Sequence, residues 1–130
     1  MLKLTRKLEY ALIALRHMQM NEEKISSTKQ ISKNYSIPLE ILAKTLQHMS
    51  KLGYINAVKG PYGGYKIHKK IIDVNLTKFI EDLEGPVWLV NCFIEDNCSQ
   101  LNNCNIRKPI NQINDNIRSV FNKINLNEII

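Results

Sequence analysis

A glycine-rich segment at residues 59–64, Lys-Gly-Pro-Tyr-Gly-Gly, separates two short runs of strand character, residues 54–58 and 65–68. Glycine adopts positive φ angles at little steric cost and lets its backbone approach another surface closely. Three glycines within six residues therefore predict a tight tip between two antiparallel strands. We expect residues 54–68 to form a β-hairpin that belongs to a larger motif with the helices before it; the simpler alternative is an ordinary hairpin with soluble flanks.

Two helical segments precede this hairpin. Ser27 or Thr28 can cap the first, which we expect over residues 28–34. Pro38 suits the first turn of the second, because the first N–H groups of a helix have no partner within it. Gly53 is well placed to end that second helix. Two helices with so short a connection form a helix-turn-helix, and a basic hairpin after it makes a winged helix.

Two further helices complete the predicted domain. Residues 6–20 place apolar side chains at helical spacing, which indicates one buried stripe. Asn75 can cap another helix that ends at about Glu84, and Gly85-Pro86 stops it. We therefore expect a mainly α fold with a small β-hairpin wing, in which residues 1–84 form a winged helix-turn-helix domain.

The positive charge of the chain is concentrated in this part. Residues 1–71 contain 13 Lys and Arg against 4 Asp and Glu, or +9, whereas residues 72–130 contain 5 against 8, or −3. A basic half indicates a polyanionic partner, most simply nucleic acid, although a solvated basic face would have the same charge. Together with the winged helix, the charge predicts binding to double-stranded DNA.

The residues expected to contact DNA follow from the winged-helix geometry. The exposed face of residues 38–48 should reach base edges in the major groove, while basic groups hold phosphates and Lys59 enters the minor groove beside the wing. The predicted DNA-binding residues are Thr28, Glu40, Ile41, Lys44, Thr45 and His48 on the helices, and Lys59, Gly60, Tyr62, Gly63 and Gly64 in the hairpin.

The second half of the chain contains three cysteines, Cys92, Cys98 and Cys104, with five residues between neighbours. Their surroundings are polar, whereas a buried structural cysteine normally lies among apolar neighbours. The odd number argues against an internal disulfide framework. Three thiols that can converge in a reducing compartment predict a metal or iron–sulfur site in residues 85–105. The alternative is a disordered loop with incidental or redox-active thiols.

Beyond Cys104, apolar residues recur at alternating spacings of four and three. They are Ile106, Ile110, Ile113, Ile117, Val120 or Phe121, and Ile124. This narrow seam is typical of a long helix that pairs with another helix. We expect residues 106–130 to form a dimerisation helix and tail that makes a homodimer. The alternative is that the helix folds back on its own domain.

Three features together resemble the IscR and NsrR family of bacterial transcription regulators: the segment Leu4–Ala11, the wing motif Lys59–Tyr65 and the cysteine spacing. The resemblance covers nearly the whole chain. It implies a homodimeric winged-helix regulator, a repressor or an activator, whose iron–sulfur cluster, [4Fe-4S] or [2Fe-2S], controls its affinity for a palindromic operator. Family members report on cluster supply, iron, nitric oxide or redox stress. By similarity, Cys92, Cys98 and Cys104 hold the cluster.

The fourth cluster ligand departs from one branch of that family. The IscR branch has a histidine three residues after the last cysteine, whereas this chain has Arg107, which cannot ligate iron. The NsrR branch uses a carboxylate near the N-terminus of the opposite subunit, and Glu9 matches that position. The resemblance thus favours three cysteines plus Glu9 of the opposite subunit, with Glu95, Asp96 or solvent as alternatives.

Other classes of function explain fewer of these features. An iron–sulfur electron carrier needs neither a basic half nor a wing. A winged-helix regulator could instead use direct cysteine oxidation or a structural zinc, although zinc would require a fourth ligand. No nucleophile–base pair or phosphate-cradling motif points to an enzyme. The sequence contains no run of about 18 apolar residues that would span a membrane, and we expect a cytoplasmic protein.

Overall fold

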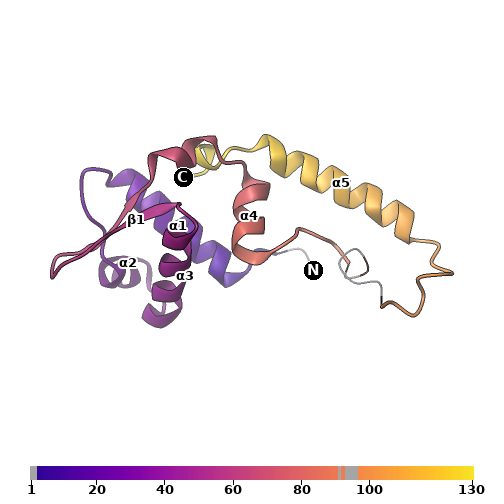
Figure 1. Ribbon diagram of the computed structural model, residues 1–130, viewed down its shortest axis with the longest axis horizontal. Coiled ribbons are helices and arrows are strands. Elements are labelled where there is room, and N and C mark those ends of the chain that lie inside the picture. Colours follow the sequence, from indigo (N-terminus) through magenta and orange to yellow (C-terminus); the bar gives the residue numbers. More distant parts are fainter. Residues whose placement is uncertain (1–2, 91, 93–96) are drawn as a thin grey trace.

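The computed structural model describes all residues except 1, 2, 91 and 93–96. Its elements, in chain order, are α1 (Arg6–Met20), α2 (Thr28–Tyr35), α3 (Leu39–Lys51), β1 (Ile55–Val58), β2 (Gly64–Ile67), the 3-10 turn η1 (Lys69–Asp73), α4 (Leu76–Glu84), α5 (Arg107–Lys123) and the 3-10 turn η3 (Leu126–Glu128). The prediction of a mainly α, winged-helix fold is confirmed. Helices α1–α3 and the hairpin form one body, and α5 extends away from it (Figure 1).

The helices begin where the sequence supplies a cap. The side chains of Thr5, Ser27 and Asn75 each accept a hydrogen bond from the backbone N–H three residues later, at 3.2, 3.1 and 2.9 Å. Such caps satisfy N–H groups that a helix leaves unpaired at its start. Helix α3 follows Pro38 and has no side-chain cap. Gly53, with φ of 84°, takes the left-handed conformation just beyond α3 and redirects the chain into β1.

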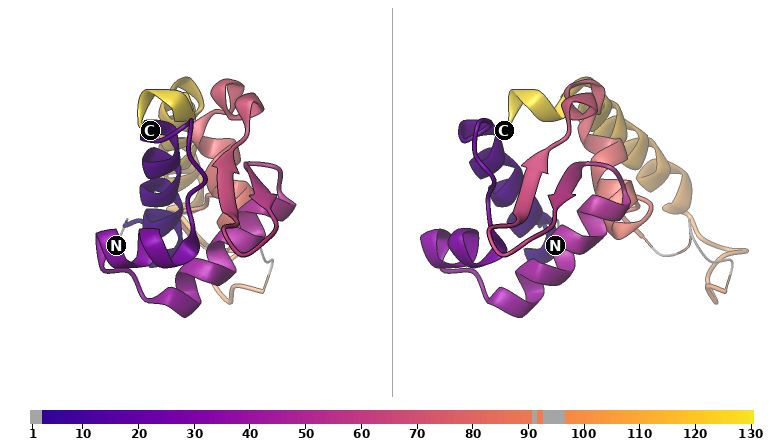
Figure 2. Two further views of the ribbon diagram at one scale, coloured as in Figure 1. Left: turned by 90° about the vertical axis from the view of Figure 1, so that its left-hand side faces the viewer. Right: turned by 60° about the vertical axis from the view of Figure 1, so that its left-hand side comes forward.

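The wing is an antiparallel pair in which Ile55 faces Ile67 and Val58 faces Gly64. A further bridge joins Ser26 to Tyr65 in β2, so the chain before α2 extends the hairpin at its inner edge. A Cβ atom on Gly64 would collide with the Ser26 carbonyl. Glycine is therefore required there by close backbone contact. Figure 2 shows the hairpin beside α1, with its tip toward the end of the molecule that contains α2 and α3.

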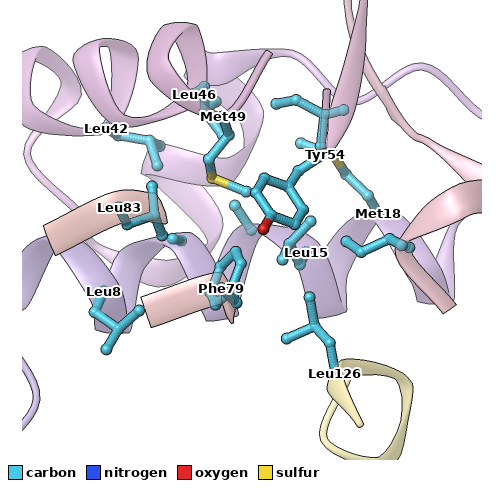
Figure 3. Close-up of a cluster of buried hydrophobic side chains, with 14 of the residues drawn as sticks. Leu8, Leu15, Met18, Leu42, Leu46, Met49, Tyr54, Phe79, Leu83 and Leu126 are labelled. Atoms are coloured by element: carbon cyan, nitrogen blue, oxygen red, sulfur yellow. The ribbon is translucent and has the colours of Figure 1, made fainter. Parts of the chain in front are cut away.

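One hydrophobic core joins α1, α3, α4, the start of β1 and the end of the chain. Leu15, Leu46 and Phe79 are fully buried in it. The rings of Tyr54 and Phe79 meet edge to face, with 5.1 Å between their centroids. Figure 3 shows Leu126, from the last turn of the chain, pointing into the same cluster. The predicted 106–130 element thus contributes a side chain to the core of the predicted 1–84 domain.

Helix α5 packs against α4 but is largely exposed to solvent. Within α5, all of whose residues are described, only Asn114 is buried. Ile106, Ile113 and Val120 are 53%, 51% and 56% exposed and follow one another at intervals of seven residues. Phe121 instead packs on the core. Among the described residues, no helix is long and apolar enough to cross a membrane.

Candidate DNA-binding surface and cysteine loop

Helix α3 presents a polar face to solvent. Glu40 and Lys44 are exposed and form an ion pair of 3.3 Å, and Ile41 beside them is 46% exposed. His48 is half-buried near the end of the helix. These four predicted residues therefore lie on the solvent-exposed side of α3, where a ligand can contact them. An exposed pair of this kind contributes little to stability, so both side chains are free to exchange partners.

The prediction that Thr45 lies on the exposed face of α3 is wrong. Its side chain is 2% exposed, and its Oγ1 donates to the carbonyl of Ile41 at 2.9 Å. In a helix, residue 45 lies between Leu42 and Met49 on the stripe that faces the core. A threonine there satisfies its hydroxyl within its own helix and has no side-chain atoms available to DNA.

Sequence reasoning missed Gln47 on the same helix. Gln47 is exposed, three residues beyond Lys44 and four before the exposed Lys51. This spacing continues the face that starts at Glu40. Glutamine carries both donors and an acceptor and can form a bidentate contact with adenine in the major groove. A stricter application of the helical period would have selected Gln47 in place of Thr45.

The wing supplies the other predicted DNA contacts. Lys59 and Gly60 are exposed in the loop that directly follows β1, and Tyr62 at the tip is 92% exposed. Gly63 and Gly64 are half-buried in the turn back into β2. The tip extends beyond α2, at the end of the molecule opposite residues 97–106 (Figure 1).

Helix α2 is held against α1 by a buried histidine. Thr28, the first residue of α2, is half-buried. At the other end of the helix, the Tyr35 hydroxyl lies 2.9 Å from Nδ1 of His17, which is 5% exposed. Burial lowers the pKa of His17, since a charged imidazole is poorly solvated there. The neutral ring therefore helps to fix α2, and with it the helix-turn-helix.

The three cysteines lie in the irregular segment between α4 and α5, and each is half-buried. Arg107, the first residue of α5, donates to the Cys92 carbonyl at 3.4 Å. Cys104 lines an open pocket of about 480 Å³ together with Arg107, Lys108 and Asn111. Both ends of the loop are thus close to the start of α5.

Three thiols are suitable donors for iron–sulfur iron, but the described parts of the chain do not bring them together. Among the described residues, no group of three or more His, Cys, Asp or Glu side chains is placed to hold a metal ion. Glu9 is half-buried in the first turn of α1, where Arg6 donates to it at 2.9 Å. Glu95 and Asp96 lie outside the described residues. The thiols therefore fit a cluster by their chemistry. To hold one, they would have to come closer together, or a second subunit would have to supply a ligand.

Residues 4–130 match the family model of Rrf2, described as an iron-dependent transcriptional regulator. The chain belongs to the Rrf2 family. It is therefore a transcription regulator and not an enzyme, as the sequence predicted. The family resemblance inferred from the wing and the cysteines is likewise confirmed.

Curated relatives agree with this assignment. The chain is 27% identical over 124 residues to an HTH-type transcriptional regulator of Aquifex aeolicus, covering 93% of this chain and 86% of the relative. It is 27% identical over 132 residues to the HTH-type transcriptional regulator NsrR of Bacillus licheniformis, covering 99% and 92%. Identity to NsrR of Shouchella clausii is 31% over 93 residues, but the match spans 71% of this chain and only 62% of that relative.

Solved structures confirm the fold. CymR, the global cysteine regulator of B. subtilis, superposes with a TM-score of 0.75 at 22% identity, covering 99% of this chain and 96% of CymR. IscR of T. potens gives a TM-score of 0.72 at 21% identity, covering 98% and 85%. At these identities the likeness concerns the fold alone.

Proposed function

We propose that this Rrf2-family regulator binds a palindromic DNA operator as a homodimer, and that an iron–sulfur cluster on the cysteine loop controls its DNA affinity. The observation that carries the proposal is that all three cysteines lie in the segment between α4 and α5, whose residues 97–106 are at the opposite end of the molecule from the wing (Figure 1). The iron-dependence in the family description supports it. A cluster in this loop can change DNA binding without itself occupying the DNA-binding face.

In this proposal, Cys92, Cys98 and Cys104 are the cluster ligands and Glu9 of the opposite subunit completes the set. A carboxylate oxygen is a harder and weaker ligand for this iron than a thiolate. When bound, the cluster, [4Fe-4S] or [2Fe-2S], supplies iron that reacts with nitric oxide or oxidants. The cluster is also lost when iron or clusters are in short supply. Arg107 lies at the base of the loop and holds the Cys92 backbone through its guanidinium.

The proposed dimer forms along the exposed seam of α5, Ile106, Ile113 and Val120. Apolar residues at intervals of seven on one helix face favour pairing with the same face of a second copy. A two-fold axis there would present two wings and two α3 helices to one duplex. Successive half-sites would then be about one DNA turn, roughly 34 Å, apart.

Anaerobic purification provides the test. We expect a brown protein with visible absorption, and a difference in affinity for a duplex of its own promoter region between the loaded and metal-free forms. Cys98→Ala should abolish both the colour and the difference. Ser99→Ala, the adjacent exposed residue, is the matched control and should preserve both. A colourless protein that contains no iron would contradict the proposal.

A second candidate keeps the DNA binding but replaces the cluster with direct cysteine oxidation or a structural zinc. The half-buried thiols, which the described residues do not assemble into a metal site, favour direct oxidation over either metal. In that case the purified protein is colourless, and its DNA affinity changes when an oxidant consumes its thiols or when zinc is removed. Metal analysis together with thiol counting before and after oxidation separates the two candidates.

DNA binding itself should depend strongly on salt. If a dimer neutralises about 6–10 phosphates, the logarithm of the affinity should fall with the logarithm of the salt concentration at a slope of roughly −5 to −9. The +9 charge of residues 1–71 motivates this expectation. A salt-independent titration, or the lack of binding to any duplex, would contradict it.

A further inference from the structure

The segment that leads into the cysteine loop is held by side chains of two helices. The backbone N–H of Val87 donates to Oε1 of Glu81 on α4 at 3.3 Å. The backbone N–H of Leu89 donates to Oδ1 of Asn114 on α5 at 3.0 Å. Residues 87–89 belong to no helix or strand. Their position three to five residues before Cys92 is therefore set by Glu81 and Asn114.

Asn114 is unusual for its place on α5. It is 1% exposed, and its neighbours on that helix face, Ile110, Ile117 and Phe121, are apolar and half-buried. Its Oδ1 is used by Leu89, but its Nδ2 has no hydrogen-bond partner in the part of the chain that the structure describes. A buried amide donor without a partner is unfavourable. A leucine would complete the apolar stripe, so the asparagine is better suited to holding Leu89 than to packing.

A second contact joins the same three segments. Oε1 of Glu81, which accepts from Val87, also accepts from Nη1 of Arg118 on α5. The Arg118 guanidinium lies 5.6 Å from the centre of the Trp88 ring. The side chains of Arg118 and Glu81 are 28% and 29% exposed, so solvent screens their attraction less than on an open surface. We call Glu81, Trp88, Asn114 and Arg118 the α4–α5 clamp.

Helix α5 connects this clamp to the cysteine loop at one end and to the domain core at the other. Arg107, at its start, contacts the Cys92 carbonyl. Just after its end, the N–H of Leu126 donates to the Val74 carbonyl at 2.8 Å, and the Leu126 side chain is fully buried in the core. The cysteine loop and the domain core are therefore attached to opposite ends of α5, with the clamp between them.

We propose that the α4–α5 clamp transmits the state of the cysteine loop to the DNA-binding domain, with Asn114 and Arg118 as positioning residues. This inference rests on the proposed function, since it needs a loop with two states that bind DNA differently. It assigns the transmission to side chains that touch neither the cysteines nor the DNA-binding face. Its specific consequence is that one substitution can weaken the coupling between the loop state and the DNA affinity without lowering the thermal stability.

Asn114→Leu separates these two properties. The variant leaves the half-buried Leu89 N–H without its acceptor, but it removes the unpaired Nδ2 and completes the apolar stripe. Because these effects oppose each other, its thermal stability should stay close to that of the wild type. The measured quantity is the ratio of affinities of the loaded and metal-free proteins for a duplex of the protein's own promoter region. This ratio should fall roughly 2- to 30-fold, the range that coupling substitutions produce. Iron content should stay unchanged.

Asp115→Asn is the control on the same helix. Asp115 follows Asn114 directly but is exposed and is not part of the clamp. Its substitution should leave the affinity ratio at the wild-type value. Arg118→Lys provides a second variant, which keeps the charge but loses the planar group above Trp88 and should reduce the ratio without loss of folding.

The outcomes distinguish the clamp from the proposed function. A wild-type ratio of one would overturn the proposed function and the transmission with it. A wild-type ratio well above one that persists in both Asn114→Leu and Arg118→Lys would overturn the clamp alone. Hydrogen exchange provides a reading that does not need the cluster: the Leu89 amide of the metal-free protein should exchange faster in Asn114→Leu. Unchanged exchange would also contradict the role of Asn114.

Discussion

Leu126→Ala tests whether the end of the chain is part of the winged-helix core. Leu126 is fully buried, and its backbone is paired with the segment before α4. The Leu126 N–H donates to the Val74 carbonyl and the Leu76 N–H to the Ile124 carbonyl, each at 2.8 Å. These bonds fix the leucine backbone, so the smaller side chain cannot easily move inward to fill the space left.

The expected loss follows from the cost of removing buried methyl groups. A fully buried Leu→Ala change that leaves a cavity costs about 2.7–5 kcal/mol. The total stability of a single domain is about 5–15 kcal/mol, so the change removes a large fraction of it. For a chain of 130 residues the melting temperature should fall by roughly 10–20 °C.

Thermal and urea unfolding of the metal-free protein at one fixed protomer concentration provide the assay, because dimerisation makes stability depend on concentration. Ile129→Ala is the control in the same tail. Ile129 is 38% exposed, and its truncation should cost less than about 1 kcal/mol. If Leu126→Ala lost no more stability than Ile129→Ala, the tail would not be part of the core and α5 would lack a fixed far end.

Three further measurements test the site and the assembly. Burial lowers the pKa of His17, so as the pH falls the unfolded chain binds a proton before the folded chain does. The free energy of unfolding should therefore drop below about pH 6.5. Urea titrations from about pH 7.5 to 5 should show a smaller drop for His17→Gln than for the wild type. The double variant Ile113→Asp and Val120→Asp should sediment as a monomer. If it stays dimeric, the interface lies elsewhere. Gln47→Ala should cost roughly 1–3 kcal/mol on the preferred duplex and relax specificity, whereas Lys59→Ala should weaken binding to all duplexes and lower the salt slope by about 1 per protomer. Uniform weakening by both variants would make Gln47 a phosphate contact.

Local signals were sufficient to predict most of the winged helix. Ser27 and Asn75 are caps with a physical reason for their position, and Gly53 takes the left-handed conformation expected of it. Each of these residues acts within a few positions of itself, so a single sequence contains all the information needed. The hairpin was predicted for the same reason, since its glycines permit the turn. The partner that requires glycine at position 64 is the Ser26 carbonyl, and the sequence did not indicate it.

Contacts between distant residues were not accessible in the same way. Leu126 resembled one more residue of a dimerisation tail until the structure placed it in the core. Asn114 looked like an ordinary polar position between seam residues, because nothing local reveals that Leu89, 25 residues earlier, needs an acceptor. Thr45 is a different case: the helical period contained the answer, and the error was to treat a polar side chain as exposed. The cysteines themselves predict a metal site, but their spacing does not determine how three thiols would come together around one.

The separation of the cysteine loop from the wing restricts how one can influence the other. A signal within one chain can pass from α5 to α4 and then to the wing, and the structure offers direct contacts for each step. Phe79 of α4 packs edge-on against Tyr54, whose hydroxyl donates to Asp82 of α4 at 2.6 Å, and Tyr54 immediately precedes β1. The alternative route is a change in the distance between the two α3 helices of a dimer. Duplexes that differ in the distance between half-sites distinguish them in the wild-type dimer, where Glu9 of the opposite subunit stays available to the cluster. Under the first route the state of the loop should change the affinity for every spacing by the same factor, and under the second it should change the preferred spacing.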